Sequence, residues 1–198
     1  MKKLNLPIIL AIIYLIFWTI LAINPVNRDV WWAENLPLVG VFLLLIFTYK
    51  KFRFSNLSYI FMAFWLFWHT IGGHYTFANV PFDFVNDLFG FSRNHFDRFG
   101  HFFIGFYAYP MAEILFRKNL CSKGLAMLFG LFFMMSVACA YEIIEWLYAA
   151  IEGGNAGIEF LGSQGDIWDA QKDMAMDTFG AIFSLICFYF LQKKPHKL

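Results

Sequence analysis

The sequence predicts an all-α membrane protein: a polytopic bundle of six transmembrane helices with one short interfacial helix on the extracytoplasmic side. Hydrophobic residues make up 60% of the 198-residue chain and charged residues only 15%, whereas a soluble domain is about half apolar and about a quarter charged. Several apolar runs also approach the ~20 residues that a helix needs to cross a bilayer. We therefore expect a single integral membrane domain over residues 1–198.

Apolar runs place six spans in order along the chain. The first, "NLPIILAIIYLIFWTILAI", is long for the apolar region of a signal peptide and ends without a small-x-small cleavage site, so we expect an uncleaved helix. The second begins near Pro37, because proline suits the first turn of a helix. The others are apolar runs separated by basic or polar loops. The predicted spans cover residues 5–23, 36–49, 56–73, 93–116, 124–150 and 167–191.

Between the third and fourth spans lies a segment, residues 74–92, that is too short and too polar to cross a bilayer. It contains "PFDFVNDLFG", in which Pro81 is placed to open a short helix and Gly90 to close it. Asp83 and Asp87 share one face of this helix, and apolar residues cover the other. We expect an amphipathic helix that lies on the extracytoplasmic surface.

Basic residues mark one side of the predicted bundle. Of the 15 Lys and Arg, 11 fall in the termini and in two short loops on the same side, and no acidic residue shares those segments. They are Lys2, Lys3, Lys50, Lys51, Arg53, Arg117, Lys118, Lys123, Lys193, Lys194 and Lys197. Because basic loops stay in the cytoplasm, both termini are expected to be cytoplasmic, and the loops 24–35, 74–92 and 151–166 are expected to be extracytoplasmic.

The spans nevertheless carry ionisable residues, and a charged side chain at the centre of a bilayer costs roughly 2.5–3.5 kcal/mol. Spacings of three or four residues put them on shared helix faces: Asp97 with His101, Glu142 with Glu145, and Asp169 with Asp173 and Asp177. At a rise of about 1.5 Å per residue, four spans bring one such group to a common level in the outer leaflet: His69, His101, Glu142 and Asp173. We therefore expect His101, Glu142 and Asp173 to converge in one buried cluster. Its expected neighbours are Asp97, Glu145 and Asp177, and His69 is expected to face it from a fourth span.

Structural roles are the alternative at each of these positions. A lone intramembrane histidine such as His69 often makes only a helix-to-helix hydrogen bond, and Asp97 could cap a helix or pair with Arg93. A structural polar core is the alternative for the whole cluster. A buried excess of acids stabilises a fold poorly, however, because each carboxylate needs a positive charge or hydrogen-bond donors to compensate its own charge. Arg98 and Lys172 are the available cations, and their direct adjacency to acidic residues places them on other helix faces.

Other polar and small residues of the spans have structural interpretations. Asp166 precedes the sixth apolar run and is expected to be its N-cap. Glu113 is expected to pair with Arg117, four residues on. Small residues are predicted to mark close helix packing rather than hinges: Gly100, Gly105, Ala108 and Gly180. The three cysteines lie far apart and lack the spacing of a disulfide framework or a metal motif.

Three stretches resemble a known family. "GHYTFANVPFDFVNDLFGFSRNHFDRFGHFFIG", "YEIIEW" and "GSQGDIWDAQKDMAMDTFGA" resemble the YjdF-like family of bacterial inner-membrane proteins, whose function is unassigned. The likeness covers nearly the whole chain and is densest over residues 72–181. It implies that this chain, too, lies in the bacterial inner membrane.

More distantly, the chain is similar to VanZ-like membrane proteins, some of which are linked to glycopeptide resistance. Their D-K-x-x-H-F resembles "DRFGHF" from Asp97, their E-x-x-Q resembles "EIIE" from Glu142, and their D-x-x-x-N-x-x-G resembles "DMAMDTFG" from Asp173. Here Glu145 replaces Gln, Asp177 replaces Asn, and the Arg that usually precedes the last motif is missing. These departures make the site more acidic, so the resemblance implies the location of the site rather than its chemistry.

Two classes of function fit the predicted cluster. In the first, a membrane-embedded site handles an amphipathic or lipid-linked substrate in the outer leaflet. Carboxylate with imidazole suits Zn or Mn, and carboxylates alone suit Mg or Ca, so a divalent metal ion is the cofactor that these residues suggest. Its candidate ligands are His101, Glu142, Asp173 and His69. Such an ion could activate water for attack on an ester or phosphoester, and without it a carboxylate beside His101 could act as general acid or base.

The second class is a proton- or cation-coupled transporter or channel, in which Asp177 near the midplane would relay ions. Against it, the spans show no internal repeat and their polar groups lie in the outer half. Haem bound by two histidines is a further alternative that the surrounding acids argue against, and a structural scaffold is another. No GxSxG, HExxH or P-loop motif identifies a reaction, so enzyme and non-enzyme both stay open, as do the substrate and the oligomeric state. Membrane lipid is an expected partner and nucleic acid is not.

Overall fold

The computed structural model describes residues 5–192, and no strand occurs among them. The elements are α1 (Leu6–Leu21), α2 (Arg28–Thr48), α3 (Asn56–Tyr75), the 3-10 turn η1 (Phe77–Asn79), α4 (Asp83–Phe89), α5 (Phe96–Ile104), the 3-10 turn η2 (Gly105–Tyr107), α6 (Ala108–Arg117), α7 (Lys123–Glu152), α8 (Gly154–Leu161) and α9 (Asp169–Leu191). The expectation of an all-α fold is confirmed.

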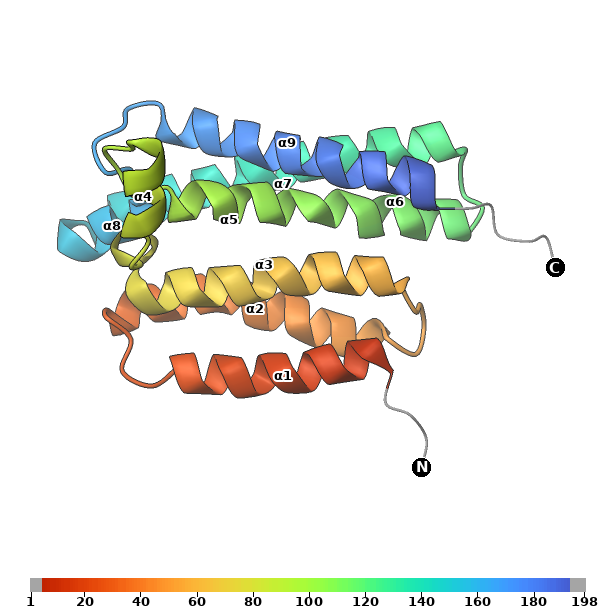
Figure 1. The fold of residues 1–198 in the computed structure, drawn as a ribbon, viewed down its shortest axis with the longest axis horizontal. Helices are drawn as coiled ribbons and strands as arrows, with labels where there is room; N and C mark the ends of the chain where they lie inside the picture. Colours follow the sequence, from red (N-terminus) through yellow and green to blue (C-terminus); the bar gives the residue numbers. More distant parts are fainter. Residues whose placement is uncertain (1–4, 193–198) are drawn as a thin grey trace.

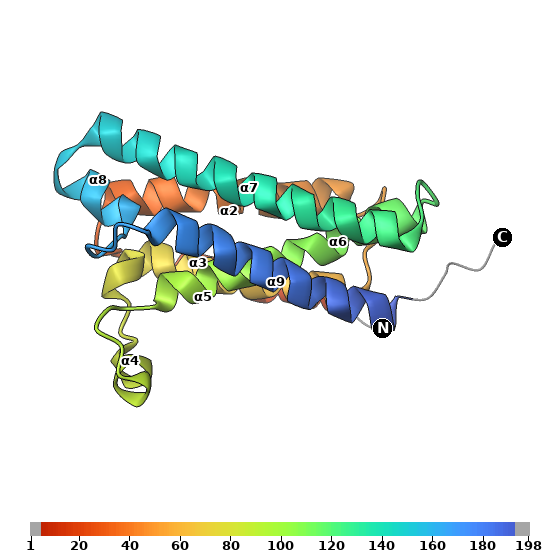
Figure 2. The ribbon, with the colours of Figure 1, turned by 90° about the horizontal axis from the view of Figure 1, so that it is seen from above.

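The long helices lie side by side along one common axis (Figure 1, Figure 2). In Figure 1, α1, α2 and α3 form one half of the bundle, and α5, α6, α7 and α9 form the other, with α3 packed against α5 between the halves. The short helices α4 and α8 lie at one end, and α4 stands away from the bundle in Figure 2. The first turn of α1 and the last turn of α9 lie at the opposite end.

Within residues 5–192, three helices are long and apolar enough to cross a membrane: α2, α7 and α9. α1 is apolar but has 16 residues, and α3 has 20 residues. The fourth predicted span is divided into α5, η2 and α6, which follow one another without a gap. Helices therefore occupy all of the predicted positions, and three of them meet the length and hydropathy of a membrane span.

The second helix begins earlier than the sequence predicts. α2 starts at Arg28, because the Asn27 side chain accepts hydrogen bonds from the backbone N–H groups of Asp29 and Val30 and so caps the helix there. Pro37 consequently lies inside the helix rather than at its start, and the prediction of a start at residue 36 was wrong. Packing against neighbouring helices makes such an interior proline tolerable in membrane proteins.

The segment before α9 also differs from the prediction. The sequence predicts a loop over residues 151–166, whereas Gly154–Leu161 forms α8, which ends at Gly162 with φ of 62°. α9 begins at Asp169 with Trp168 as its N-cap, so the assignment of Asp166 as the N-cap was wrong. Asp166 instead accepts the backbone N–H of Trp168 at 3.0 Å and shapes the turn that precedes the helix.

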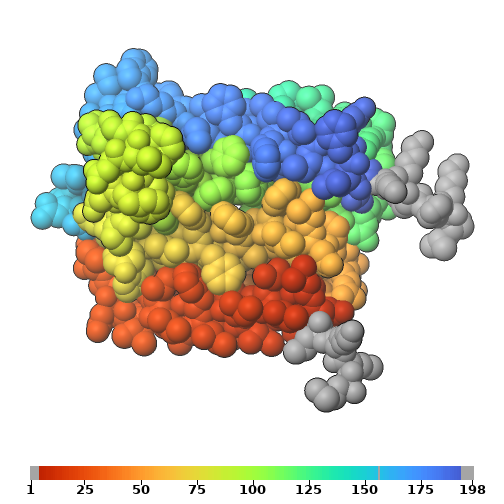
Figure 3. Space-filling view, in the orientation of Figure 1, coloured from red at the N-terminus to blue at the C-terminus, as the bar shows by residue number. Residues whose placement is uncertain are grey.

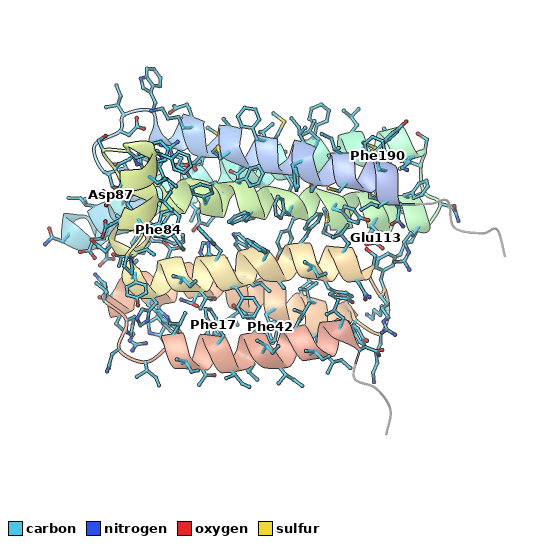
Figure 4. All side chains as sticks on the ribbon, viewed as in Figure 1. Phe17, Phe42, Phe84, Asp87, Glu113 and Phe190 are labelled. Atoms are coloured by element: carbon cyan, nitrogen blue, oxygen red, sulfur yellow. The ribbon has the colours of Figure 1, made fainter. Side chains whose placement is uncertain are left out.

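The predicted short helix is present as α4, although it begins at Asp83, two residues after Pro81. It ends at Gly90, whose φ of 68° is the left-handed conformation that glycine adopts readily. Phe84 and Leu88 are among its exposed apolar side chains. Figure 4 shows Phe84 and Asp87 on this helix, at the end of the bundle that also carries α8. An exposed apolar face suits a helix that lies in a membrane interface.

Two glycines let α5 and α9 approach closely. A Cβ atom on Gly180 would lie 1.9 Å from the carbonyl oxygen of Phe102, and one on Gly105 would lie 2.3 Å from that of Asp177. Neither contact is sterically allowed, so both positions require glycine, and the prediction of close packing there is confirmed. This crossing brings the residues of α5 and α9 that face each other into direct contact, among them His101 and Asp177.

The opposite end of the bundle holds an apolar core and one buried acid. Tyr109, Met134 and Phe188 are among the buried residues that fill the space between α6, α7 and α9. Glu113 is fully buried on α6 and accepts hydrogen bonds from the Ser55 backbone N–H at 2.9 Å and from Arg117 at 2.6 Å. The expected pairing with Arg117 is confirmed. Figure 4 places Glu113 at the end of the bundle away from Asp87.

Candidate functional site

His101 lies at the centre of the polar residues that the spans contribute. Its Nδ1 atom is 3.2 Å from Oδ2 of Asp177 on α9. On the other side of the ring, Nε2 is 3.7 Å from Oδ1 of Asp97, one turn earlier on α5, and 4.0 Å from Oε1 of Glu142 on α7. One buried imidazole thus faces carboxylates from three helices.

Asp97, His101 and Asp173 have the spacing of a cation site. Each offers one ligand atom, and the three atoms lie within 4.8 Å of one another. Two ligands of one ion cannot be farther apart than twice the bond length, which is about 4.2 Å for Zn²⁺ and about 5 Å for Ca²⁺. The 4.8 Å limit lies within the range for Ca²⁺, whereas for Zn²⁺ the widest of these separations would have to shrink by about 0.6 Å or more.

Two carboxylate oxygens in this cluster lack partners. Oε1 of Glu142 and Oδ1 of Asp177 are buried and accept no hydrogen bond from the residues that the structure describes, whereas Oδ1 of Asp173 has Nε of Arg98 at 3.2 Å. Buried charge without compensation is expensive, so such oxygens call for a cation, a proton or ordered water. Unpartnered carboxylates around an imidazole are the donor set that a divalent cation prefers, and the residues present fit such an ion.

Arginines occupy the layer between this cluster and the α8 end. Arg98 is buried on α5 and reaches across to α9, where its guanidinium bonds to Asp169 and lies 3.2 Å from Oδ1 of Asp173. Arg93 bonds to Asp169 at 2.6 Å and so does not pair with Asp97. Arg98 thus pairs with acids of the neighbouring helix and not with Asp97 beside it in the sequence, so its adjacency to Asp97 did not predict the acids that it compensates.

Asp166, in the loop before α9, takes part in the same group of ion pairs between α5 and α9. Its Oδ2 accepts from Lys172 at 2.6 Å and from Arg98 at 3.1 Å. The hydrogen bond from Lys172, followed by the one from the Trp168 backbone, holds the pKa of the Asp166 carboxyl below its usual range. The charged form of Asp166 is therefore the one that ties the loop to α5 and α9.

A second histidine–carboxylate pair faces His101 across the interior, and the sequence alone did not predict it. Nε2 of His69 lies 3.0 Å from Oε2 of Glu34, which also accepts the hydroxyl of Tyr141 at 3.1 Å. The Tyr141 ring stands between the two imidazoles, 6.5 Å from His69 and 6.4 Å from His101 between ring centroids. His69 is thus bound to Glu34 and lies apart from the trio formed by Asp97, His101 and Asp173.

Glu34 was missed because the sequence was interpreted as loop up to residue 35. It is only 2% exposed, since α2 already includes it. A signal for it exists: Trp31, Glu34 and Leu38 are spaced at three and four residues, as on one helix face, and all three are buried. A helix start before Pro37 would have placed Glu34 inside the bundle.

Both histidines line one small cavity. Its walls include Glu34, His69, Tyr141, Asp177 and Glu145, together with Asp97 and His101. Space for the centres of water-sized molecules amounts to about 30 Å³, which is room for an ion or one or two waters and not for a lipid. Phe160 of α8 and Gly162 also line it, so the segment that follows α7 closes the cavity at this end.

Comparison with known proteins places the chain in a family. Residues 6–194 match the family described as "Predicted membrane protein (DUF2238)". The chain belongs to this family. Over 163 residues it is 34% identical to the inner membrane protein YjdF of Escherichia coli (strain K12), an alignment that covers 81% of this chain and 78% of that protein. No solved structure gives a significant match. The resemblance to YjdF-like proteins and the expectation of a membrane protein are confirmed, and the DUF2238 match spans every residue of the cluster.

Proposed function

We propose that this protein lies in the bacterial inner membrane and crosses it six times, with both termini in the cytoplasm. Its relative YjdF is named an inner membrane protein. Besides α2, α7 and α9, α3 and the continuous run from α5 to α6 reach the roughly 20 residues that a span requires. The basic loops after α2 and α6 lie at the end away from α8. The positive-inside rule then puts the His101 cluster in the outer half of the membrane.

The function that this geometry supports best is the binding of a divalent cation by the His101 cluster, for hydrolysis of an ester or phosphoester in an amphipathic or lipid-linked substrate. The observation that carries it is the convergence of Asp97, His101 and Asp173 within 4.8 Å, beside one buried oxygen each of Glu142 and Asp177 that accepts no hydrogen bond from the described residues. A purely structural core would pair those oxygens, as the opposite end of the bundle does for Glu113.

The residues around the cluster have separate roles in this proposal. A bound divalent cation supplies a polarised oxygen and an acidified water. Asp177 holds Nδ1 of His101, which fixes the ring and leaves Nε2 turned toward Asp97 and Glu142. Glu142 has an oxygen free to accept a proton. The Glu34–His69 pair lies on the facing wall, where it can accept or return a proton through the waters of the cavity.

The small cavity constrains the substrate. Because it holds an ion and one or two waters rather than a molecule, a substrate would bring only its polar group to the cluster and leave its apolar part in the bilayer. Phe160 and Gly162 close the cavity on the α8 side, and entry there requires this segment to move. A lipid-linked substrate in the outer leaflet meets both conditions.

The transport alternative receives less support. It requires a polar route from the cluster to the end of the bundle that carries the chain termini. Tyr109, Met134 and Phe188 are buried in the apolar core that fills that half between α6, α7 and α9. Glu113 lies at its far end and is bound to Ser55 and Arg117.

Cation binding by the purified protein tests the proposal. Metal analysis and calorimetric titration with Mn²⁺ or Zn²⁺ should give one tightly bound ion per chain. His101→Gln and Asp173→Asn should abolish binding, and Asp177→Asn, which removes the group that holds the ring, should weaken it by about 10- to 100-fold. Glu152→Gln, at an exposed acid at the end of α7, is the matched control and should bind as the wild type does. Stoichiometric binding that survives both His101→Gln and Asp173→Asn, or no binding at all, would contradict the proposal.

A further inference from the structure

An apolar groove runs along α1, α2 and α3, at the end of the bundle away from the His101 cavity. It offers a volume of about 390 Å³, which lies in the range of small-molecule sites. Among residues 5–192 its lining is aliphatic and aromatic, and the only polar side-chain atoms that these residues contribute are the hydroxyls of Tyr14, Tyr49 and Tyr59. In Figure 3, α1 forms the outermost edge of this half of the molecule, so the groove lies where a membrane protein meets lipid.

The length of the groove matches one leaflet. It is bounded by Pro7–Leu15 on α1, Phe42–Tyr49 on α2 and Tyr59–Leu66 on α3. At about 1.5 Å per residue these stretches are about 10 to 12 Å long, and half of a hydrocarbon core of ~30 Å is about 15 Å. One end of each stretch lies on the side of the loop that joins α2 to α3. The groove therefore extends from that surface toward the middle of the bilayer.

The surface end of the groove carries one unused hydrogen-bonding group. The hydroxyl of Tyr49 is buried without a partner in the part of the chain that the structure describes, whereas that of neighbouring Tyr59 interacts with the Phe54 backbone. Tyr14, deeper in the groove, is different because its hydroxyl bonds to Thr70 at 3.2 Å. The Tyr49 hydroxyl is thus left at the depth where the ester and phosphate groups of a lipid lie.

The same end is positively charged. The guanidinium of Arg53 lies over the ring of Tyr49 at 5.5 Å, and Lys50 and Lys51 beside it are exposed. The sequence has no acidic residue between Glu34 and Asp83. Glu113 of α6 reaches the loop between α2 and α3, where it is bound to Ser55, Ser58 and Arg117. Basic residues beside a membrane attract anionic lipids, so the charge favours an anionic head group.

We propose that this groove is a binding site for an anionic phospholipid of the leaflet on the side of the basic loops. One acyl chain lies between α1, α2 and α3, and the phosphate is held by the hydroxyl of Tyr49 and by Arg53. A single acyl chain suits the volume better than a helix of another copy does, because a helix with its side chains is about 10 Å across. The site is separate from the His101 cluster and does not depend on its chemistry.

Native mass spectrometry of the full chain in detergent, with added phosphatidylglycerol or phosphatidylethanolamine, tests the proposal. The wild type should retain phosphatidylglycerol at least tenfold better than phosphatidylethanolamine. Ala63→Trp, which fills the groove, should lose most of this retention. The control Ala140→Trp, at an exposed position on α7, should keep it. Arg53→Gln should lower the preference for phosphatidylglycerol while the chain still binds lipid.

Three results would overturn the proposal: no preference for the anionic lipid in the wild type, equal retention by Ala63→Trp, or a change of oligomeric state in Ala63→Trp, which would assign the groove to a contact between copies. If Ala63→Trp does not fold, Tyr49→Phe combined with Arg53→Gln decides the matter, because it removes the head-group contacts and leaves the apolar lining in place. Unchanged preference in that double variant would equally refute the site.

Discussion

Two buried acids, Asp173 and Glu113, show how the same kind of residue behaves at opposite ends of the bundle. Glu113 is surrounded by donors and is bound to Ser55 and Arg117. Asp173 has an oxygen without a hydrogen bond, and its nearest cation, Arg98, is already shared with Asp169. The first arrangement stabilises the fold. In the second, Asp173 shares a single guanidinium with Asp166 and Asp169.

We therefore predict different stabilities for two matched amide variants. Glu113→Gln should destabilise the purified protein by about 1.5 to 3 kcal/mol, because it weakens the charge-assisted hydrogen bonds that the buried carboxylate accepts from Ser55 and Arg117. Asp173→Asn should change the stability by less than about 1 kcal/mol in the absence of metal, because it removes one of several neighbouring negative charges and leaves Arg98 with two other partners. Thermal unfolding in detergent measures both. An equal loss of stability in the two variants would mean that the cluster mainly stabilises the fold.

The ion pairs of Asp166 with Lys172 and Arg98 predict that the stability of the protein depends on pH. Because the pKa of Asp166 is lowered in the folded protein, chiefly by Lys172, its charged form stabilises the fold above the ordinary aspartate pKa of about 3.9. This contribution is lost as the pH falls through the lowered folded pKa. Asp166→Asn should therefore unfold at a lower temperature than the wild type at pH 7, and the gap should close toward pH 3. A gap that does not change with pH would show that the ion pairs of this loop contribute nothing.

At the scale of elements, the crossing of α5 and α9 positions the cluster. We predict that Gly180→Ala destabilises the protein by about 1 to 3 kcal/mol or more, since the added methyl group overlaps the carbonyl oxygen of Phe102. It should also weaken cation binding, because separating the helices moves Asp177 away from His101. Gly124→Ala is the control: a Cβ atom there meets nothing within 4 Å, and alanine favours a helix by up to about 1 kcal/mol. If Gly180→Ala binds the cation as the wild type does, the crossing does not set the site.

The elements also show where sequence reasoning succeeds and where it stops. Helical spacing puts Asp97 beside His101 and Asp173 beside Asp177, because i to i+4 geometry is local to one helix. The pairing of Arg98 with acids of α9 depends on how two helices face each other, which no local pattern contains. The burial of Glu34 was not predicted, because Pro37 suits the first turn of a helix and the helix was therefore expected to begin after Glu34.

For the whole molecule, composition and apolar run length predict a helical membrane protein, because bilayer thickness fixes the length of a span. They do not predict that α1, α2 and α3 form one half of the bundle, since that arrangement follows from side-chain packing between helices distant in sequence (Figure 1). They likewise missed α8, whose glycine-flanked sequence resembles a loop. What the charges along the sequence do predict is an orientation that can be measured.

We predict that the α8 segment faces outward and the loop between α6 and α7 faces the cytoplasm, because the basic residues gather at the latter end. In a cysteine-free background, Asn155→Cys should react with a membrane-impermeant thiol reagent in spheroplasts. Asn119→Cys, also exposed, should react only after the membrane is opened. The reverse pattern would invert the orientation, and labelling of both in intact spheroplasts would rule out six spans.

The central claim is that one cation binds at His101, and paramagnetic resonance of the Mn²⁺-loaded protein with ¹⁵N-labelled histidine tests it most directly. The structure has His101 among the ligand trio and His69 bound to Glu34. We predict nitrogen hyperfine coupling from a single histidine, which disappears in His101→Gln and persists in His69→Gln. A spectrum without nitrogen coupling, or coupling that is lost only in His69→Gln, would contradict the account.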